Sequence, residues 1–442
     1  MVIKSPKTLY LNLTLQAFRF AILVKRPIYF HRALPIIIYL AAGLTGCARF
    51  PVWQAPAEVL ITDYTIALTL NDFEGGGTSN DFDSKDIPNL PAPKGLRPCC
   101  AFGNKLKVKL GEMPLAGFKL DNIRASEDLG PHKFDNGLVS LDLSDNRGWV
   151  DDENNGLVYT CRGGFIDIAH VRDNADMTIF LAAEAGRNMD VGGVSNMPDQ
   201  GGKIRVVFHP VAEEILDEHG RLQLAARIGQ WVAFQLSIWH EIVTWYGFAS
   251  MDAWPEKLSS FSPEDLYSNL LGVKIAGAII TSMQASDDYT YNRSMDNWIK
   301  RVLNRLQAVS REDGIEAIDR VDGIWWDSQR PLPDWQITLR RHFLSEKQIK
   351  PWLISMAGVT LDACVTAKPR LDLLLPSAIS GTRFDELATI EIDVDNELIK
   401  NGFPLLATDQ RTVTQADFSR LAETIRSEVV EVLGSKAGQP EP

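Results

Sequence analysis

The stretch of residues 222–248 constrains the fold more than any other part of the sequence. It is long and mostly apolar, and its hydrophobic residues occur all round a helix rather than along one stripe. A surface helix buries one apolar face, whereas a helix that is hydrophobic all round is itself buried. The sequence therefore predicts a central helix around which the rest of the chain packs.

The remaining pattern is helix-rich with small β elements, which favours one α+β body. Residues 167–185 show helical spacing, and Ser262 followed by Pro263 is a typical helix start. Further helices are expected at 262–284, 295–309 and 414–433, and strands at 105–110, 156–161 and 203–208.

Length and charge narrow the class of protein. The chain has 442 residues, which is enough for a large core and allows two or three domains. Its formal net charge is −12, whereas a nucleic-acid binder needs a basic face. No nucleic-acid partner is therefore expected.

The N-terminal segment has the pattern of a targeting signal. Basic residues from Lys25 to Arg32 precede a short apolar run at 33–43, and the letters L-T-G-C then end at Cys47. The run is too short for a membrane-spanning helix, which needs about 20 residues. The segment resembles a bacterial lipoprotein signal, and the alternative is an uncleaved anchor with a chance cysteine.

The resemblance implies that Cys47 is lipid-modified and tethers the protein to a membrane. Ala48 stands where an aspartate retains many such proteins in the inner membrane, so the resemblance implies the outer membrane and a periplasmic body. We expect a signal at 1–47, a tether and irregular lead-in at 48–95, the main domain at 96–433 with a looser C-terminal lobe from about 325, and a tail at 434–442.

The central stretch contains the pair His240 and Glu241. Burying a charge without a partner costs several kcal/mol, so the pair is expected to bind something. It is the first half of the zinc-peptidase pattern H-E-x-x-H, but Thr244 replaces the second histidine. The alternative is a buried pair that neighbouring helices satisfy.

A second polar cluster lies on the helix expected at 167–185. Asp167, His170 and Asn174 share one face, and a carboxylate three residues before a histidine can bind a metal or orient the histidine. The alternative is that Asp173 and Asp176 form a solvated face. The predicted metal ligands, with zinc favoured, are His170, His240, Asp167 and Asp173, and the predicted catalytic groups are Glu241 as base with His240 and His170.

Two weaker observations complete the site prediction. Asp265 and Asn269 lie four residues apart near the start of the next helix, facing whatever it packs against. His209, which follows a strand, is a further possible metal ligand.

The adjacent Cys99 and Cys100 allow two interpretations. In an oxidising compartment disulfides are permitted, and we favour a bond between one of them and Cys161. Alternatively, one of them is a nucleophile with His170 or His240 as its base, as in a Cys-His hydrolase.

Four motifs together carry a family resemblance. They read RPCCAFG at 97–103, DIAHVRD at 167–173, WHEIVTWYG at 239–247 and FSPEDLYSNLLG at 261–272. They resemble an uncharacterised bacterial family of exported lipoproteins, a domain of unknown function, over about residues 95–430. The resemblance implies an exported protein with one contiguous domain.

These observations lead to one functional expectation and its rivals. We expect a periplasmic hydrolase, with or without a bound metal, that is anchored in the outer membrane and acts on cell-envelope material such as peptidoglycan or lipid. The rivals are a non-enzymatic structural or assembly lipoprotein and the Cys-His hydrolase.

Overall fold

The computed structural model describes residues 61–71, 90–93, 95–98, 100–110, 113–135, 153–250, 255–343, 348–405 and 411–438. The expected signal with Cys47, most of the tether, Cys99 and the end of the tail lie outside these residues.

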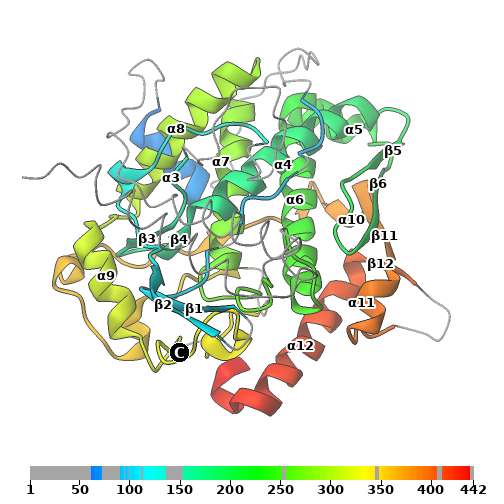
Figure 1. Cartoon of the computed structure of the whole chain (residues 1–442). Coiled ribbons are helices and arrows are strands. Elements are labelled where there is room, and N and C mark those ends of the chain that lie inside the picture. Colours follow the sequence, from blue (N-terminus) through cyan, green and yellow to red (C-terminus); the bar gives the residue numbers. More distant parts are fainter. Residues whose placement is uncertain are drawn as a thin grey trace, which may run out of the picture. The chain divides into compact units, whose positions relative to one another are not determined.

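Three helices form the centre of the described body: α4 (Ile168–Asn188), α6 (Arg221–Trp245) and α7 (Asp265–Thr281). They pack against one another (Figure 1). Most residues of α6 are buried on every face, as its apolar sequence predicts. The helix ends before Gly247, whose φ of +99° is readily adopted only by glycine.

Glycines let these helices approach closely. A Cβ atom at Gly272 of α7 would lie 2.1 Å from the Val171 carbonyl oxygen of α4. A Cβ atom at Gly229 of α6 would lie 2.6 Å from the Ala182 nitrogen of α4. The absence of a side chain lets α7 approach the first turn of α4 at Gly272 and lets α6 approach α4 at Gly229.

A four-stranded antiparallel sheet packs beside α6. Its order is β12 (Thr412–Thr414), β11 (Ala388–Val394), β6 (Gly202–Phe208) and β5 (Gly193–Asn196). Alternate residues of β6 and β11 are buried, which is the period expected of a half-buried strand. The apolar face thus formed belongs to the same core as the three helices.

The C-terminal part of the chain is joined to the main body, where the sequence suggested a looser lobe. Strand β11 pairs with β6 along its whole length, and α12 (Phe418–Leu433) packs on α6. The pairing links segments that are far apart in the sequence, and no local pattern indicates it.

The remaining elements confirm the α+β class. The other helices are α3 (Asp63–Asn71), α5 (Glu213–His219), α8 (Asp288–Arg305), α9 (Arg311–Arg320), α10 (Phe384–Leu387) and α11 (Asn396–Lys400). The other strands form antiparallel pairs: β1 (Leu106–Leu110) with β2 (Met113–Leu120), β3 (Leu157–Thr160) with β4 (Gly164–Asp167), β7 (Gln348–Ile349) with β8 (Leu373–Leu374), and β9 (Ala378–Ile379) with β10 (Thr382–Arg383).

The β3–β4 hairpin separates two hydrophobic clusters. Val158 and Ile166 face the main core, whereas Tyr159 and Phe165 face a smaller cluster around Trp325. Successive strand residues point to opposite faces, so one short hairpin can serve both clusters. Its second strand ends at the boundary between them, where α4 begins.

The disulfide differs from the predicted pairing. Cys161 is bonded to Cys364, with 5.3 Å between the Cα atoms, and Cys100 is a free thiol. The proximity of motifs in the sequence suggested Cys99 or Cys100 as the partner. The fold instead brings the loop of Cys364 to the end of β3, within the Cα separation that a disulfide requires.

Among the described residues, no helix is both long enough and apolar enough to cross a membrane.

Candidate functional site

Asp167 fixes the start of α4 and the direction of its first turn. Its Oδ1 atom accepts hydrogen bonds from the backbone nitrogens of Ala169 (2.8 Å) and His170 (3.4 Å). Its Oδ2 atom accepts one from the Cys100 nitrogen at 3.1 Å. Aspartate is a preferred helix N-cap because it satisfies these otherwise unpaired donors. The cap also holds His170 at the boundary where β4 becomes α4.

The His170 ring is oriented by α7. Its Nδ1 atom lies 2.7 Å from Oδ1 of Asn269, which also accepts a hydrogen bond from Asn174 (2.7 Å). An amide oxygen is only an acceptor, so Nδ1 carries a proton. In neutral His170 the lone pair is then on Nε2, 3.7 Å from Asp265 Oδ1 and 3.9 Å from Asp167 Oδ2.

Two carboxylates on other helices face this ring. Glu241 comes from the centre of the core on α6, and its Oε2 atom accepts a hydrogen bond from the Phe261 nitrogen at 2.8 Å. Its Oε1 atom makes no hydrogen bond within the described residues. Asp265 begins α7, and its two oxygens accept hydrogen bonds from the nitrogen (2.6 Å) and hydroxyl (3.0 Å) of Ser262.

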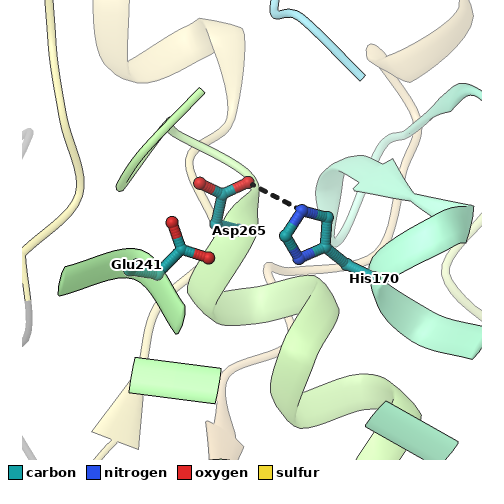
Figure 2. Close-up of side chains that lie close together, drawn as sticks. All are labelled: His170, Glu241 and Asp265. Atoms are coloured by element: carbon teal, nitrogen blue, oxygen red, sulfur yellow. Dashed lines mark ion pairs between the residues drawn. The ribbon is translucent and has the colours of Figure 1, made fainter. Parts of the chain in front are cut away.

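These three side chains form a candidate metal site. One ligand atom from each of His170, Glu241 and Asp265 lies within 4.8 Å of the other two, and all three residues are buried. Figure 2 shows the three side chains pointing toward one another from α4, α6 and α7. Within the described part of the chain, no other three histidine, cysteine, aspartate or glutamate residues bring ligand atoms this close to one another.

The carboxyl groups here are crowded as well as buried. Asp167, Glu241, Glu264 and Asp265 are each at most 2% exposed. Burial, with Asp265 beside it, raises the pKa of Glu241 well above its usual value. Burial and the neighbouring carboxylates also raise the pKa values of Glu264 and Asp265 well above theirs. Without a cation, this group therefore retains protons that free carboxyl groups would lose.

The basic groups nearby balance this charge only in part. Burial lowers the pKa of His170, but Asp167 and Glu241 outweigh it, so the net shift is upward. Burial lowers the pKa of Arg341 to about 10, against the opposing effect of Asp265. The Arg341 guanidinium donates hydrogen bonds to the carbonyl oxygens of Ser260, Leu258 and Trp335 rather than to a carboxylate.

His240 lies beside this group but outside it. Its ring centroid is 6.4 Å from that of His170. Burial and the charge of His170 lower the pKa of His240 to about 3, so its imidazole is neutral near pH 7. The hydroxyl of buried Thr244, in place of the second histidine of the zinc-peptidase pattern, makes no hydrogen bond within the described residues. The third residue of the candidate group, Asp265, comes from α7 rather than from α6.

Asp173 and Asp176 belong to a separate ion-pair network around Arg97. The Arg97 Nη1 atom lies 2.7 Å from Asp173 and 3.0 Å from Asp176, and its Nε atom lies 2.6 Å from Glu153. The structure thus places Asp173 against Arg97 and not with Glu241 and Asp265. It also shows that Asp176, offered above as part of a solvated face, is buried.

The other candidates occupy different surroundings. His209 lies at the end of β6, where its Nε2 atom is 2.9 Å from the Thr389 hydroxyl on β11.

Burial and the nearby Asp167 raise the pKa of the Cys100 thiol well above its usual value. Only a thiolate is a good nucleophile, so these surroundings disfavour Cys100 as a catalytic cysteine.

Sequence reasoning ranked Asp265 too low and did not find Arg341. Asp265 follows Ser262-Pro263, a combination that reads first as a helix start, and its carboxylate does cap that turn. The place of Asp265 in the candidate metal site depends on the close approach of α7 to α4, which Gly272 permits. No local signal connects Arg341 with the site.

No curated protein and no solved structure matches the chain, but one protein family does. The sequence matches the family described as "Protein of unknown function (DUF4056)" over residues 87–355, more than half of the chain. The matched range includes His170, Glu241 and Asp265, together with the four motifs noted above. The chain therefore belongs to the DUF4056 family.

Proposed function

We propose that this protein is a metal-dependent hydrolase of the bacterial cell envelope. The observation that carries the proposal is the convergence of ligand atoms from His170, Glu241 and Asp265 within 4.8 Å of one another inside a buried group of carboxyls. Buried like charges are costly, and a divalent cation would offset them.

The donor set suits zinc. Catalytic zinc is commonly held by three protein ligands drawn from histidine and carboxylate side chains, with a fourth position left for water. The hydrogen bond that His170 donates to Asn269, and those that Glu241 accepts from Phe261 and Asp265 accepts from Ser262, would orient the three ligands. Such supporting contacts fix ligand geometry and tune metal affinity.

The metal, when bound, would supply a water whose pKa is lowered to about 7. Glu264 is the chain's candidate base, because its Oε2 atom makes no hydrogen bond within the described residues and the charge of a bound cation would favour its ionised form. Glu241, expected from sequence to be the base, is better placed as a ligand. Neutral His240 borders the same site, with its ring centroid 6.4 Å from that of His170.

The compartment and substrate class rest on two further observations. The segment ending at Cys47 resembles a lipoprotein signal, and the Cys161–Cys364 disulfide suits an oxidising compartment such as the periplasm. A protein tethered to the outer membrane in this way would meet peptidoglycan and lipid, the substrates we propose.

Elemental analysis after loading with zinc and removal of excess metal tests the site. We expect the wild-type chain to retain one equivalent of zinc and the His170→Ala variant to lose it. His209→Ala is the matched control, because it removes a histidine in the sheet, and it should retain the metal. Failure of wild type to retain zinc, or equal retention by all three proteins, would contradict the proposal.

The activity and the location need separate measurements. Zinc-loaded wild type should release soluble fragments from purified peptidoglycan or fatty acids from phospholipid vesicles, as detected by mass spectrometry, and a chelator should stop the release. The Cys47→Ala variant should move from the membrane fraction to the soluble fraction. No release from either substrate would refute the hydrolase, whatever the metal content.

A further inference from the structure

A cationic pocket lies away from the candidate metal site, between α3 and the last turn of α8. Its volume is about 260 Å³. Arg301, Arg305 and Lys368 bring positive charge to its wall, and among the described residues that line it Asp63 is the one that is acidic. The pocket is therefore cationic, although the formal net charge of the chain is −12.

Among the described residues, the three cations take part in no ion pair. Within the part of the chain that the structure describes, none of them pairs with a carboxylate, and the buried Nε atom of Arg305 makes no hydrogen bond. The dipole of α8 favours Arg301 and Arg305 at its C-terminal end. That effect does not explain Lys368, which comes from a distant loop.

The wall of the pocket is held in place by several contacts. The Cys161–Cys364 disulfide joins the end of β3 to the loop that leads to Lys368. The Lys368 nitrogen donates a hydrogen bond to Gln307 Oε1 at 2.8 Å. Arg162 donates from Nε to the Pro369 carbonyl oxygen (2.9 Å) and from Nη1 to that of Arg305 (3.1 Å). These contacts hold the backbone segments that carry Arg305 and Lys368 beside each other before any ligand arrives.

This arrangement has an electrostatic cost. Burial, followed by the charge of Arg305, lowers the pKa of Arg162. A bound anion would offset this repulsion. Arginine matches the tetrahedral oxygens of phosphate well, because its planar group can donate two parallel hydrogen bonds.

We propose that the pocket formed by Arg301, Arg305 and Lys368 binds the phosphate group of a ligand. The amide side chains of Asn304 and Gln307 add neutral donors to the same wall. The volume is slightly below the range of about 300–1,000 Å³ typical of small-molecule sites, so the pocket suits a small charged group. That group could be free phosphate or the headgroup of a phospholipid.

Isothermal titration calorimetry of the full chain with inorganic phosphate tests whether the ligand is free phosphate. Flotation of the protein with vesicles of phosphatidylglycerol, compared with vesicles of phosphatidylcholine, tests whether the ligand is the headgroup of a phospholipid. The test variant is Arg301→Gln with Lys368→Gln, and the charge-matched control is Lys400→Gln with Arg420→Gln. Any lipid anchor is common to all three proteins and cancels in the comparison.

Whichever of the two ligands wild type binds, phosphate or phosphatidylglycerol vesicles, we expect the test variant to bind it at least about tenfold more weakly. The reason is that the substitutions remove charge-assisted hydrogen bonds. The control should bind as wild type does. Saturable binding of phosphate alone assigns a soluble phosphate ligand, and preference for phosphatidylglycerol alone assigns a lipid headgroup. If neither probe binds, or if the test variant and the control bind equally, the proposal is wrong. Thermal unfolding of all three proteins checks that they are folded.

Discussion

The Nε2 atom of His170 lies 3.7 Å from the Oδ1 atom of Asp265, although the two residues come from different helices. Each side chain is held from behind, His170 by Asn269 and Asp265 by Ser262. Together with Glu241 they form a buried group in which acidic side chains outnumber basic ones. This imbalance gives the metal-free protein a measurable dependence on pH.

We expect the metal-free protein to lose stability as the pH rises from about 7 to about 9. The pKa values of Glu241, Asp265 and Glu264 are raised well above normal in the folded state. These groups therefore hold protons that the unfolded chain has released, so unfolding releases protons and rising pH favours it. Each such group contributes at most about 1.4 kcal/mol per pH unit to the free energy of unfolding.

Urea denaturation across this pH range measures the effect. Glu241→Gln should make the dependence shallower, because one titrating group is gone, whereas the exposed control Glu397→Gln should leave it unchanged. Loading with zinc should also make the free energy of unfolding depend less on pH. A wild-type stability that does not fall over this range would rule out protonated carboxyls in the folded site.

Gly272→Ala should destabilise the protein although alanine favours helices. The new Cβ atom would meet the Val171 carbonyl oxygen at 2.1 Å, which is backbone and cannot move aside cheaply. Overpacking of this kind costs about 1–3 kcal/mol. The same change should separate α7 from α4 and weaken zinc binding, which calorimetric titration would measure.

Gly314→Ala in α9 is the matched control. There the nearest atom to a new Cβ is a side-chain methyl of Ile123 at 3.1 Å, which can shift. Its free energy of unfolding should change by less than about 1 kcal/mol in either direction. The close approach of the helices would be called into question if Gly272→Ala were as stable as this control.

Arg97→Met should be strongly destabilising, since it leaves Glu153, Asp173 and Asp176 without their shared cation. Arg97 is 2% exposed, and breaking a buried ion pair by removing one partner costs about 3–5 kcal/mol. Arg221→Met removes an exposed arginine paired with Asp190 and should cost less than about 1 kcal/mol. Chemical denaturation of both variants provides the comparison, and similar losses would mean that the Arg97 network adds no more than a surface pair.

Much of the local structure could be predicted from the sequence because its determinants are local. Helical spacing after Asp167 and the helix-start pattern Ser262-Pro263 located two of the three central helices to within a few residues, although α7 begins at Asp265 and Ser262 is not its N-cap. Two of the three residues of the candidate site followed from this. His170 and Glu241 stood out because polar groups in apolar helices need partners.

The sequence by itself determined that the apolar stretch beginning at Leu222 forms a buried central helix, since a helix that is apolar all round has no face to give to water. Only the tertiary structure decided that Asp265 joins His170 and Glu241, that Cys161 bonds Cys364, and that Asp173 pairs with Arg97. Periodicity and capping are properties of neighbouring residues, whereas these contacts join segments whose proximity depends on how helices and strands pack.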